Sequence, residues 1–349
     1  MKIGVMTFHW ADNYGAVLQS FALVKYLNGR GHSAEDINYL PLRMYTRKRI
    51  KQLLFFQTDK LKKASCFRGF RKKFLRLSKK TYYSNRSLFT GTDKYDAVIC
   101  GSDQIWNEVF CMMAERKPTL SYFLNFVKNP QKKISYAASF GTNVMPTSLA
   151  KYALPELRTF DFISVRERTA VDMLGQNGIK AVLVCDPTFL LDAEDYQEIF
   201  SSCLGKEKIQ LFNYMLRRGR ESTDNTDDYV KNTIFSGKSN LGACTITPEE
   251  WLFQIYSCDC VVTDSFHGTV FAILFHKPFL SINDKNCTMN ARIKTLLERV
   301  GLEDHMLEEY DEQKIKDILS LSVDWAAVDA LRKEWKAEAE GFLTKALVE

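Results

Sequence analysis

The sequence lacks any apolar run of the 18 or so residues that a membrane-spanning helix needs. The longest candidate, residues 269–282, is shorter and contains His276, Lys277 and Pro278. The opening residues MKIGVMTF carry no small-residue cleavage pattern, so we expect no signal peptide and a cytoplasmic protein. Hydrophobic residues make up 46% and charged residues 26% of the chain, which excludes a disordered or collagen-like protein.

Paired cysteines and the familiar cofactor motifs are missing too. The nine cysteines show no paired spacing, and Cys258 and Cys260 have no second pair that would complete a zinc site. We therefore expect buried free thiols in a reducing compartment. The chain also has no glycine-rich dinucleotide fingerprint, no phosphate-loop lysine motif and no cluster of histidines and acids. These absences argue against a nicotinamide-, ATP- or metal-dependent enzyme.

What is present is an alternation of short apolar strands with helices. A strand at 2–8, a helix ending near 29 and a strand at 33–40 form a βαβ unit, which implies a parallel sheet. Further strands are expected at residues 95–100, 133–138, 162–165, 181–185, 210–216, 260–263 and 279–282. Further helices are expected at residues 269–275, 291–300 and 325–347.

We predict an α/β fold with two doubly wound, Rossmann-like domains and a cleft between them, since 349 residues make roughly two domains. Residues 1–192 form the first domain, with a basic helical insertion at 43–90. Residues 193–322 form the second, and 323–349 form a C-terminal helix that packs back on the first. Ligands of such sheets bind beyond the carboxyl ends of the strands.

The net charge of +6 is unevenly distributed. Residues 43–80 contain fifteen Lys or Arg and a single acid, so this segment carries +14 and the remaining residues carry −8. Apolar residues recur within it at helical spacing: Ile50, Leu53, Leu54 and Leu61, then Phe67, Phe70, Phe74 and Leu77. This pattern predicts amphipathic helices whose cationic face meets either solvent or an anionic membrane surface. No nucleic-acid recognition motif accompanies the basic segment.

The sharpest candidate site is the polar loop between the strand at 260–263 and the helix that follows it. Backbone N–H groups at a helix start favour a bound anion, and a histidine there can move a proton. We assign His267 and Asp264 to catalysis, and Ser265, Gly268 and Thr269 to binding of the anion. The same residues could instead only cap the helix.

Other loops after strands offer hydrogen-bonding side chains. We also assign Arg166 to catalysis, because it can clamp a carboxylate or phosphate; the alternative is that it simply pairs with Glu167. His9 is interpreted as an ordinary loop residue. Trp106 offers an aromatic face for a sugar, or else it is a core residue in a tight turn. The candidate sugar-binding residues are Asn13, Tyr14, Gly15, Ser102, Asp103, Gln104, Trp106, Asn107 and Ser139.

Five motifs together resemble those of the polysaccharide pyruvyl transferase family. In chain order they are Asn13-Tyr14-Gly15-Ala16, Gly101-Ser102-Asp103-Gln104-Ile105-Trp106-Asn107, Ser164-Val165-Arg166-Glu167, Asp186-Pro187-Thr188 and Asp264-Ser265-Phe266-His267-Gly268. The family's histidine motif often carries an arginine where this chain has Ser265. The resemblance implies that this arginine helps to hold the donor anion. Either Arg166, Arg292 or Lys285 takes over that role here, or the donor site is altered.

The resemblance also implies a fold and a function. Family members look like two-Rossmann-domain (GT-B) glycosyltransferases. They transfer pyruvate from phosphoenolpyruvate, a co-substrate, to a sugar of a surface-polysaccharide precursor, with no cofactor and no obligatory metal. The product is a pyruvyl ketal, and the acceptor is often a polyprenyl-diphosphate-linked oligosaccharide. The basic segment would then dock the enzyme on the inner face of the plasma membrane.

Two alternatives to a pyruvyltransferase stay open at this point. One is a nucleotide-sugar-dependent glycosyltransferase on the same architecture. The other is a non-catalytic partner in glycan assembly, which would use the basic helices as an interaction surface.

Overall fold

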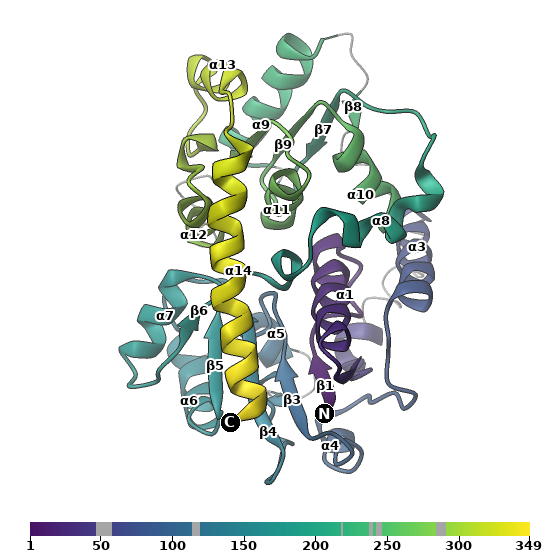
Figure 1. Cartoon of the computed structure of the whole chain (residues 1–349), viewed down its shortest axis with the longest axis vertical. Coiled ribbons are helices and arrows are strands. Elements are labelled where there is room, and N and C mark those ends of the chain that lie inside the picture. The colour runs from purple at the N-terminus through teal and green to yellow at the C-terminus, as the bar shows by residue number, and fades with distance from the viewer. Residues whose placement is uncertain (47–57, 114–118, 218, 237–239, 242–245, 284–290) are drawn as a thin grey trace. The chain divides into compact units, whose positions relative to one another are not determined.

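The computed structural model describes residues 1–46, 58–113, 119–217, 219–236, 240–241, 246–283 and 291–349. These residues form two compact units, coloured by residue number in Figure 1. Met1–Leu190 and Lys336–Glu349 form the first unit, and Leu191–Trp335 forms the second. The boundary predicted after residue 192 lies close to this division. Helix α14 (Trp325–Val348) contributes residues to both units.

The sheet of the first unit has the strand order β2-β1-β3-β4-β5-β6, with every neighbouring pair parallel. Its strands are β1 (Lys2–Met6), β2 (Ser33–Asp36), β3 (Ala97–Cys100), β4 (Lys132–Ala138), β5 (Phe162–Val165) and β6 (Val182–Leu183). All residues of β3 are buried, because a parallel strand is covered on both faces. The strand order reverses between β1 and β3, so their carboxyl ends form a switch point, the usual ligand position in such sheets.

Helices of the first unit follow the strands. They are α1 (Tyr14–Gly29), α3 (Thr58–Phe74), α4 (Asn85–Leu88), α5 (Glu108–Met113), α6 (Thr147–Leu157) and α7 (Arg168–Gly175). Single 3₁₀ turns lie at Ser121–Phe123 and Pro187–Leu190. Helix α1 begins where it does because the Asn13 side chain accepts a hydrogen bond from the Ala16 amide at 3.1 Å.

Part of the basic segment is folded onto the first unit. The helix expected around residues 67–77 is confirmed as far as Phe74, and Phe67 and Phe70 are fully buried against the protein. The weaker pattern at 50–54 lies outside the described residues. The strand predicted at 33–40 ends at Asp36, because the backbone beyond it pairs with residues 76–82. The Asp36 amide donates to the Arg76 carbonyl and the Leu40 amide to the Tyr82 carbonyl, both at 2.8 Å.

The sheet of the second unit repeats this topology in the order β8-β7-β9-β10-β11, again with parallel pairs. Its strands are β7 (Leu211–Tyr214), β8 (Asn240–Leu241), β9 (Cys260–Thr263), β10 (Phe279–Ile282) and β11 (Met306–Leu307). Its helices are α8 (Gln197–Phe200), α9 (Glu221–Tyr229), α10 (Pro248–Ser257), α11 (Phe266–Leu274), α12 (Ala291–Val300) and α13 (Glu312–Ser320). Short 3₁₀ turns at Ala193–Tyr196, Ser201–Cys203 and Glu303–His305 and a π-turn at Val230–Ile234 complete it. The predicted pair of doubly wound α/β domains is therefore confirmed, and its switch point here lies between β7 and β9.

Helix α11 begins earlier than predicted. The expected start was residue 269, but the helix starts at Phe266, because the Ser265 hydroxyl accepts a hydrogen bond from the Gly268 amide at 3.2 Å. His267 and Gly268 consequently belong to the first turn of the helix rather than to a loop.

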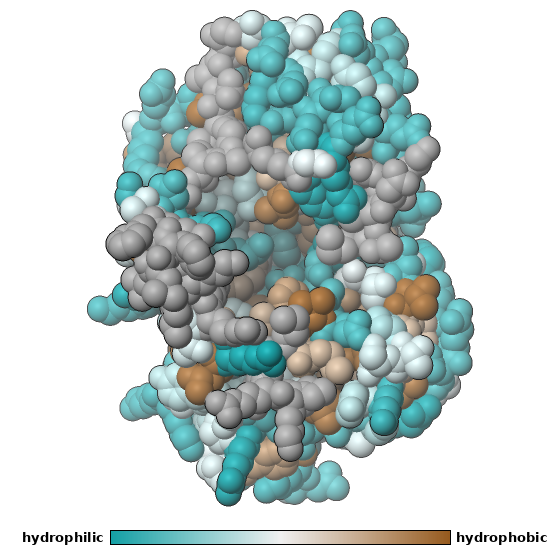
Figure 2. Space-filling view, turned by 180° about the vertical axis from the view of Figure 1, so that it is seen from behind, coloured by the Kyte–Doolittle hydropathy of each residue, from teal (hydrophilic) through white to brown (hydrophobic). Residues whose placement is uncertain are grey.

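The surface and the cysteines give two further observations. None of the helices in the described part of the chain has both the length and the apolar character that crossing a bilayer requires. On the face shown in Figure 2, hydrophilic residues predominate and hydrophobic residues form small separate patches. The seven described cysteines are free thiols, and all except Cys66 are buried.

Candidate functional site

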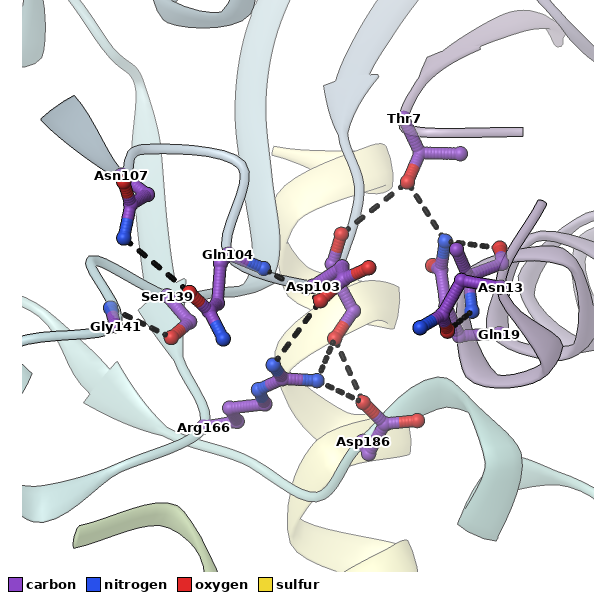
Figure 3. A network of polar contacts seen from close by, with 12 residues as sticks. Thr7, Asn13, Gln19, Asp103, Gln104, Asn107, Ser139, Gly141, Arg166 and Asp186 are labelled. Carbon is purple, nitrogen blue, oxygen red and sulfur yellow. Dashed lines mark hydrogen bonds and ion pairs between the residues drawn. The ribbon is translucent and has the colours of Figure 1, made fainter. Parts of the chain in front are cut away.

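The switch point of the first unit is crossed by a hydrogen-bonded chain of side chains (Figure 3). The Thr7 hydroxyl, just beyond β1, donates to the Ser102 carbonyl at 3.2 Å and accepts from the Gln19 amide at 2.7 Å. These bonds join the ends of β1 and β3 to helix α1. The loop backbone at this edge is therefore fixed in position.

Arg166 lies at the centre of a buried charge network beside this chain. Figure 3 shows its guanidinium pointing toward Asp103 and Asp186. Its Nη1 donates to Asp186 at 2.8 Å and to the Ser102 hydroxyl at 3.2 Å, and Asp103 and Glu167 lie at 3.5 and 3.8 Å. Burial opposes the positive charge of Arg166, but the three carboxylates outweigh burial and raise its pKa above the ordinary value.

Asp186 receives several further hydrogen bonds. Asp186 Oδ1 accepts from the backbone amide and the hydroxyl of Thr188, at 3.1 and 2.8 Å. The Ser102 hydroxyl donates at 2.7 Å to Asp186 Oδ2, the oxygen that also binds Arg166. Asp186 therefore holds Arg166 in place, and the network links the ends of β3 and β5 to the chain after β6. Binding of a substrate anion by Arg166 stays a prediction.

Asp103 is the network member with the more exposed side chain. Its side chain is 18% exposed, whereas that of Arg166 is fully buried. Its backbone has φ = +81°, a left-handed conformation that is uncommon for a residue other than glycine. Its carbonyl accepts the Ser139 amide at 3.1 Å, which holds this loop against the end of β4. Strain of this kind concentrates at functional sites, so the geometry favours Asp103 as a reactive or ligand-binding carboxylate.

Beside Asp103, two side-chain amides face one another. The Asn107 side-chain amide donates to Gln104 Oε1 at 3.2 Å. Gly141 closes this corner with φ = +67°, and a Cβ there would collide with the Gln104 side chain. The Ser139 hydroxyl accepts the Gly141 amide at 3.1 Å. These side chains provide donors and acceptors of the kind that sugar hydroxyls need.

The predicted sugar-binding residues divide into two groups. Asn13 is exposed, and Asp103, Gln104 and Asn107 are partly exposed, so these four are accessible. The others, Tyr14, Gly15, Ser102, Trp106 and Ser139, are buried. Of the two interpretations of Trp106, the core residue is confirmed and the aromatic face for a sugar is wrong: its ring is fully buried, because it stacks on Phe123 at 5.8 Å and packs against Phe140 at 5.2 Å.

Two other residues that follow β1 are structural. The Tyr14 ring packs on Phe67 of α3 at 5.0 Å, which covers it. His9 is buried and hydrogen-bonded to the Asn38 side chain at 3.2 Å, and burial lowers the pKa of His9 to about 4. His9 is therefore a neutral packing residue near pH 7.

At the switch point of the second unit, Asp264 joins the ends of β9 and β7. Its carboxylate accepts the amides of Leu216 and Arg217 at 2.6 and 2.8 Å. The Arg217 guanidinium donates to the Asp264 carbonyl at 2.8 Å. Burial raises the pKa of Asp264 above its ordinary value, although these amides and Arg217 oppose the shift. Asp264 is thus tied to the loop backbone, and a direct catalytic role for it stays a prediction.

His267 lies in the first turn of α11, and the Phe266 ring that it packs against also contacts an arginine. Its ring packs edge-on against Phe266 at 5.1 Å, and the Arg292 guanidinium lies 5.8 Å from the centre of the Phe266 ring. Arg292 is the second residue of α12 and is buried. His267 and Arg292 thus both contact Phe266, and the donor-binding role of Arg292 stays a prediction. Lys285 lies outside the described residues.

The remaining residues of this turn are used in packing. Gly268 leaves no room for a side chain, since a Cβ would lie 2.8 Å from Thr263 Oγ1. The Thr269 hydroxyl is buried and hydrogen-bonded to Ser281 at 3.0 Å. Their predicted contribution to anion binding can therefore come only from the helix backbone.

Sequence reasoning missed Arg217 and Asp186. Arg217 lies three residues after the end of β7 and 3.7 Å from Asp264, so it adds an arginine to the edge at which α11 begins. The signal was available, because an arginine at the carboxyl end of a predicted parallel strand stands at the ligand-binding edge. Asp186 was part of a motif, but its pairing with Arg166 needs the fold to be seen.

The comparison with protein families decides the classification. The model of the polysaccharide pyruvyl transferase family matches residues 13–286. The chain belongs to this family. The five motifs that resembled it lie within or at the border of the matched range, and as a member the protein is an enzyme of the transferase class. Among curated proteins, no match to the chain was found.

Solved structures with a similar fold include two UDP-N-acetylglucosamine 2-epimerases and a protein in complex with UDP and glucose. UDP-N-acetylglucosamine 2-epimerase from Rickettsia bellii is 9% identical with a TM-score of 0.53, covering 99% of this chain and 95% of its own. The enzyme from Neisseria meningitidis, bound to UDP-GlcNAc, is 10% identical with a TM-score of 0.52 and full coverage of both chains. HepE from Anabaena, in complex with UDP and glucose, is 10% identical with a TM-score of 0.51, covering 99% and 96%. At these identities the likeness shows the fold alone, and it confirms the predicted GT-B type.

Proposed function

We propose that this polysaccharide pyruvyl transferase moves pyruvate from phosphoenolpyruvate to two hydroxyls of one sugar, forming a cyclic ketal and releasing phosphate. The observation that carries the proposal is the surroundings of the α11 N-terminus, where Arg217 pairs with Asp264, and His267 and Arg292 both lie against the Phe266 ring. Phosphoenolpyruvate carries a phosphate and a carboxylate. Two arginines and a helix N-terminus are suited to these anions.

Histidine fits the proton transfers that this reaction needs. Protonation of the methylene carbon makes the neighbouring carbon electrophilic, and one sugar hydroxyl adds there. Phosphate leaves, and the second hydroxyl closes the ring. Of the two hydroxyl protons, one replaces the proton used on the methyl group and the other leaves with phosphate. His267 would supply and recover protons in these steps, a role worth roughly 10²–10⁴ in rate.

The first unit would bind the acceptor sugar. Of the predicted sugar-binding residues, Asn13, Asp103, Gln104 and Asn107 are accessible, and the buried Arg166 holds Asp103 in orientation. The carboxylate of Asp103 would accept a hydroxyl proton or stabilise positive charge at the reacting carbon. Asp264 suits this less well, because its carboxylate already accepts two backbone amides.

The acceptor would be a lipid-linked precursor of a surface polysaccharide, which places the enzyme at the inner face of the membrane. Exposed cations on α3, including Lys60, Lys62 and Lys73, would attract anionic lipids. Phe67 and Phe70 cannot insert into lipid, since both are buried in the protein. Membrane contact would therefore be electrostatic and would weaken with salt.

Thermal unfolding with added ligands tests the proposal. Phosphoenolpyruvate at 100 times its dissociation constant should stabilise the wild type by about 2.7 kcal/mol, whereas UDP-sugars should not. His267→Ala should keep the fold and lose transfer to a sugar acceptor by roughly 10²–10⁴. A shift with a UDP-sugar and none with phosphoenolpyruvate would instead support a glycosyltransferase. Near wild-type turnover of His267→Ala would remove His267 from the mechanism.

A further inference from the structure

The first unit contains a recess, which the basic segment helps to enclose. It has a volume of about 330 Å³, within the usual range for small-molecule sites. Residues that follow β1 and β2 form one side of it, and α3 and the residues after α3 form the other. The lining residues are His9, Trp10, Asn38, Leu40, Tyr45, Arg68, Arg71, Lys72 and Leu77.

Helix α3 is a fixed wall of this pocket. Phe67 and Phe70 anchor it through their buried rings. Arg71 donates to the carbonyls of Trp10 and Ala11 at 3.3 Å and pairs with Asp12 at the same distance. The positive charge of Arg71 is therefore balanced within the protein, and the helix holds its position against the loop after β1.

Arg68 and Lys72 differ from Arg71, because no described carboxylate pairs with their positive charges. Both are exposed on α3, and their i, i+4 spacing puts them on one face of the helix, where like charges repel. Within the described ranges, neither side chain makes a hydrogen bond or ion pair with the protein. No carboxylate is among the described residues that line the pocket, and burial keeps His9 uncharged. An anion bound between Arg68 and Lys72 would relieve their repulsion.

The rest of the pocket is largely apolar. Trp10, Leu40 and Leu77 contribute hydrophobic side chains beside the two cations. A guanidinium and an ammonium suit phosphate oxygens, and an apolar wall suits a hydrocarbon group attached to the phosphate. We propose that this pocket binds a phosphate or diphosphate ester whose attached group is apolar.

The position of the pocket connects it with the acceptor site. Trp10 and Asn13 are three residues apart, so their Cα atoms are separated by at most about 11 Å. Thr7, whose carbonyl contacts the His9 ring at 3.3 Å, also belongs to the hydrogen-bonded chain at the switch point. If the proposed function holds, on which this step rests, the ester is the lipid-linked acceptor, and its sugar extends toward Asn13 and Asp103.

Calorimetric titration of the full chain tests the pocket. The probes are farnesyl diphosphate, inorganic diphosphate and farnesol. Farnesyl diphosphate should bind more tightly than either of the others, since only it offers both the anion and the apolar group. The variant Arg68→Ala with Lys72→Ala should weaken its binding about 10- to 100-fold, because each lost charge-assisted hydrogen bond is worth roughly tenfold.

A matched control removes the same charge from the same helix. Lys60→Ala with Lys62→Ala changes two exposed α3 lysines that do not line the pocket, so farnesyl diphosphate should bind within about threefold of the wild type. Arg68→Lys with Lys72→Arg should keep most of the affinity. Thermal unfolding checks that every variant is folded. Equal losses of farnesyl diphosphate affinity in the two alanine variants would overturn the proposal that this pocket binds the ester. Equal affinity for inorganic diphosphate and farnesyl diphosphate would overturn it too.

Vesicles distinguish a soluble ester from a membrane surface. Binding to vesicles with anionic phospholipid should fall alike in both alanine variants, while farnesyl diphosphate binding should fall in one only. If the variant Arg68→Ala with Lys72→Ala loses binding to anionic vesicles but binds farnesyl diphosphate like the wild type, the pocket assignment is wrong. None of these titrations requires catalysis. A protein inactive with phosphoenolpyruvate that still shows this pattern contradicts the proposed function and leaves the pocket standing.

Discussion

The five strands of the second sheet follow the same order as the first five strands of the six-stranded sheet, yet the ligand-binding edges of the two units are built differently. In the first unit, a fully buried Arg166 and its carboxylate partners connect the loops after three strands. In the second unit, Arg217 keeps 13% of its side chain exposed, and Asp264 accepts backbone amides. The shared topology therefore determines where each edge lies, and the side chains determine how it is used. In the proposed reaction, the buried network of the first unit would position the acceptor, and the partly exposed Arg217 would contact an anionic donor.

The largest expected effect comes from breaking the network of the first unit. Arg166→Met should destabilise that unit by about 3–5 kcal/mol, because it leaves Asp186 buried without its charge partner. Arg217→Met in the second unit should cost about 1 kcal/mol, since this arginine is partly solvated. Urea unfolding followed by fluorescence measures both. Equal losses in the two variants would contradict the contrast between the edges.

The two edges should also respond to pH with opposite sign. Because the pKa of His9 falls from 6.5 to about 4 on folding, its contribution to stability is present above pH 6.5 and is lost as the pH drops toward 4. The loss amounts to at most about 3 kcal/mol. The pKa of Asp264 is raised, so its contribution is lost as the pH rises through that value. The free energy of unfolding of His9→Gln should depend less on pH than that of the wild type between pH 6.5 and about 4.

If the free energy of unfolding of His9→Gln changed with pH as steeply as that of the wild type, another group would be responsible for the titration in this range. Asp264→Asn gives the complementary measurement. It should abolish the loss of stability with rising pH that the ionised carboxyl causes, even though it weakens the bonds to the β7 end.

The smallest expected effect separates capping from binding in the second unit. Ser265→Ala and Thr247→Ala each remove a helix N-cap, of α11 and α10, and each should cost about 1 kcal/mol. Only Ser265→Ala should also weaken phosphoenolpyruvate binding, since only α11 starts at the switch point. If both variants bind phosphoenolpyruvate like the wild type, Ser265 only caps its helix.

Much of the fold could be predicted because parallel strands read as short continuous apolar runs. The bounds expected at 162–165, 260–263 and 279–282 are those of β5, β9 and β10. Helix α12 was likewise predicted at its observed residues, 291–300. The two-residue strands β8 and β11 were missed, whereas the equally short β6 was predicted because it lies within the apolar run 181–185.

The candidate site was less predictable, because its contacts are long-range. Arg166 meets Ser102 and Asp186 across 64 and 20 residues of sequence, which no local pattern reveals. The burial of Trp106 likewise depends on Phe123 and Phe140, which follow it in separate elements. The histidine motif could be found, because a strand, a capping serine and an apolar helix stand together in the sequence.

The central claim is that the second unit binds the donor while the first positions the acceptor. Calorimetric titration of phosphoenolpyruvate into Arg217→Ala and Asp103→Asn tests it most directly. Arg217→Ala should weaken binding about tenfold or more, through loss of a charge-assisted contact. Asp103→Asn should bind phosphoenolpyruvate like the wild type and yet fail to transfer pyruvate to a sugar. The reverse pattern, with donor binding lost in Asp103→Asn and kept in Arg217→Ala, would contradict the account.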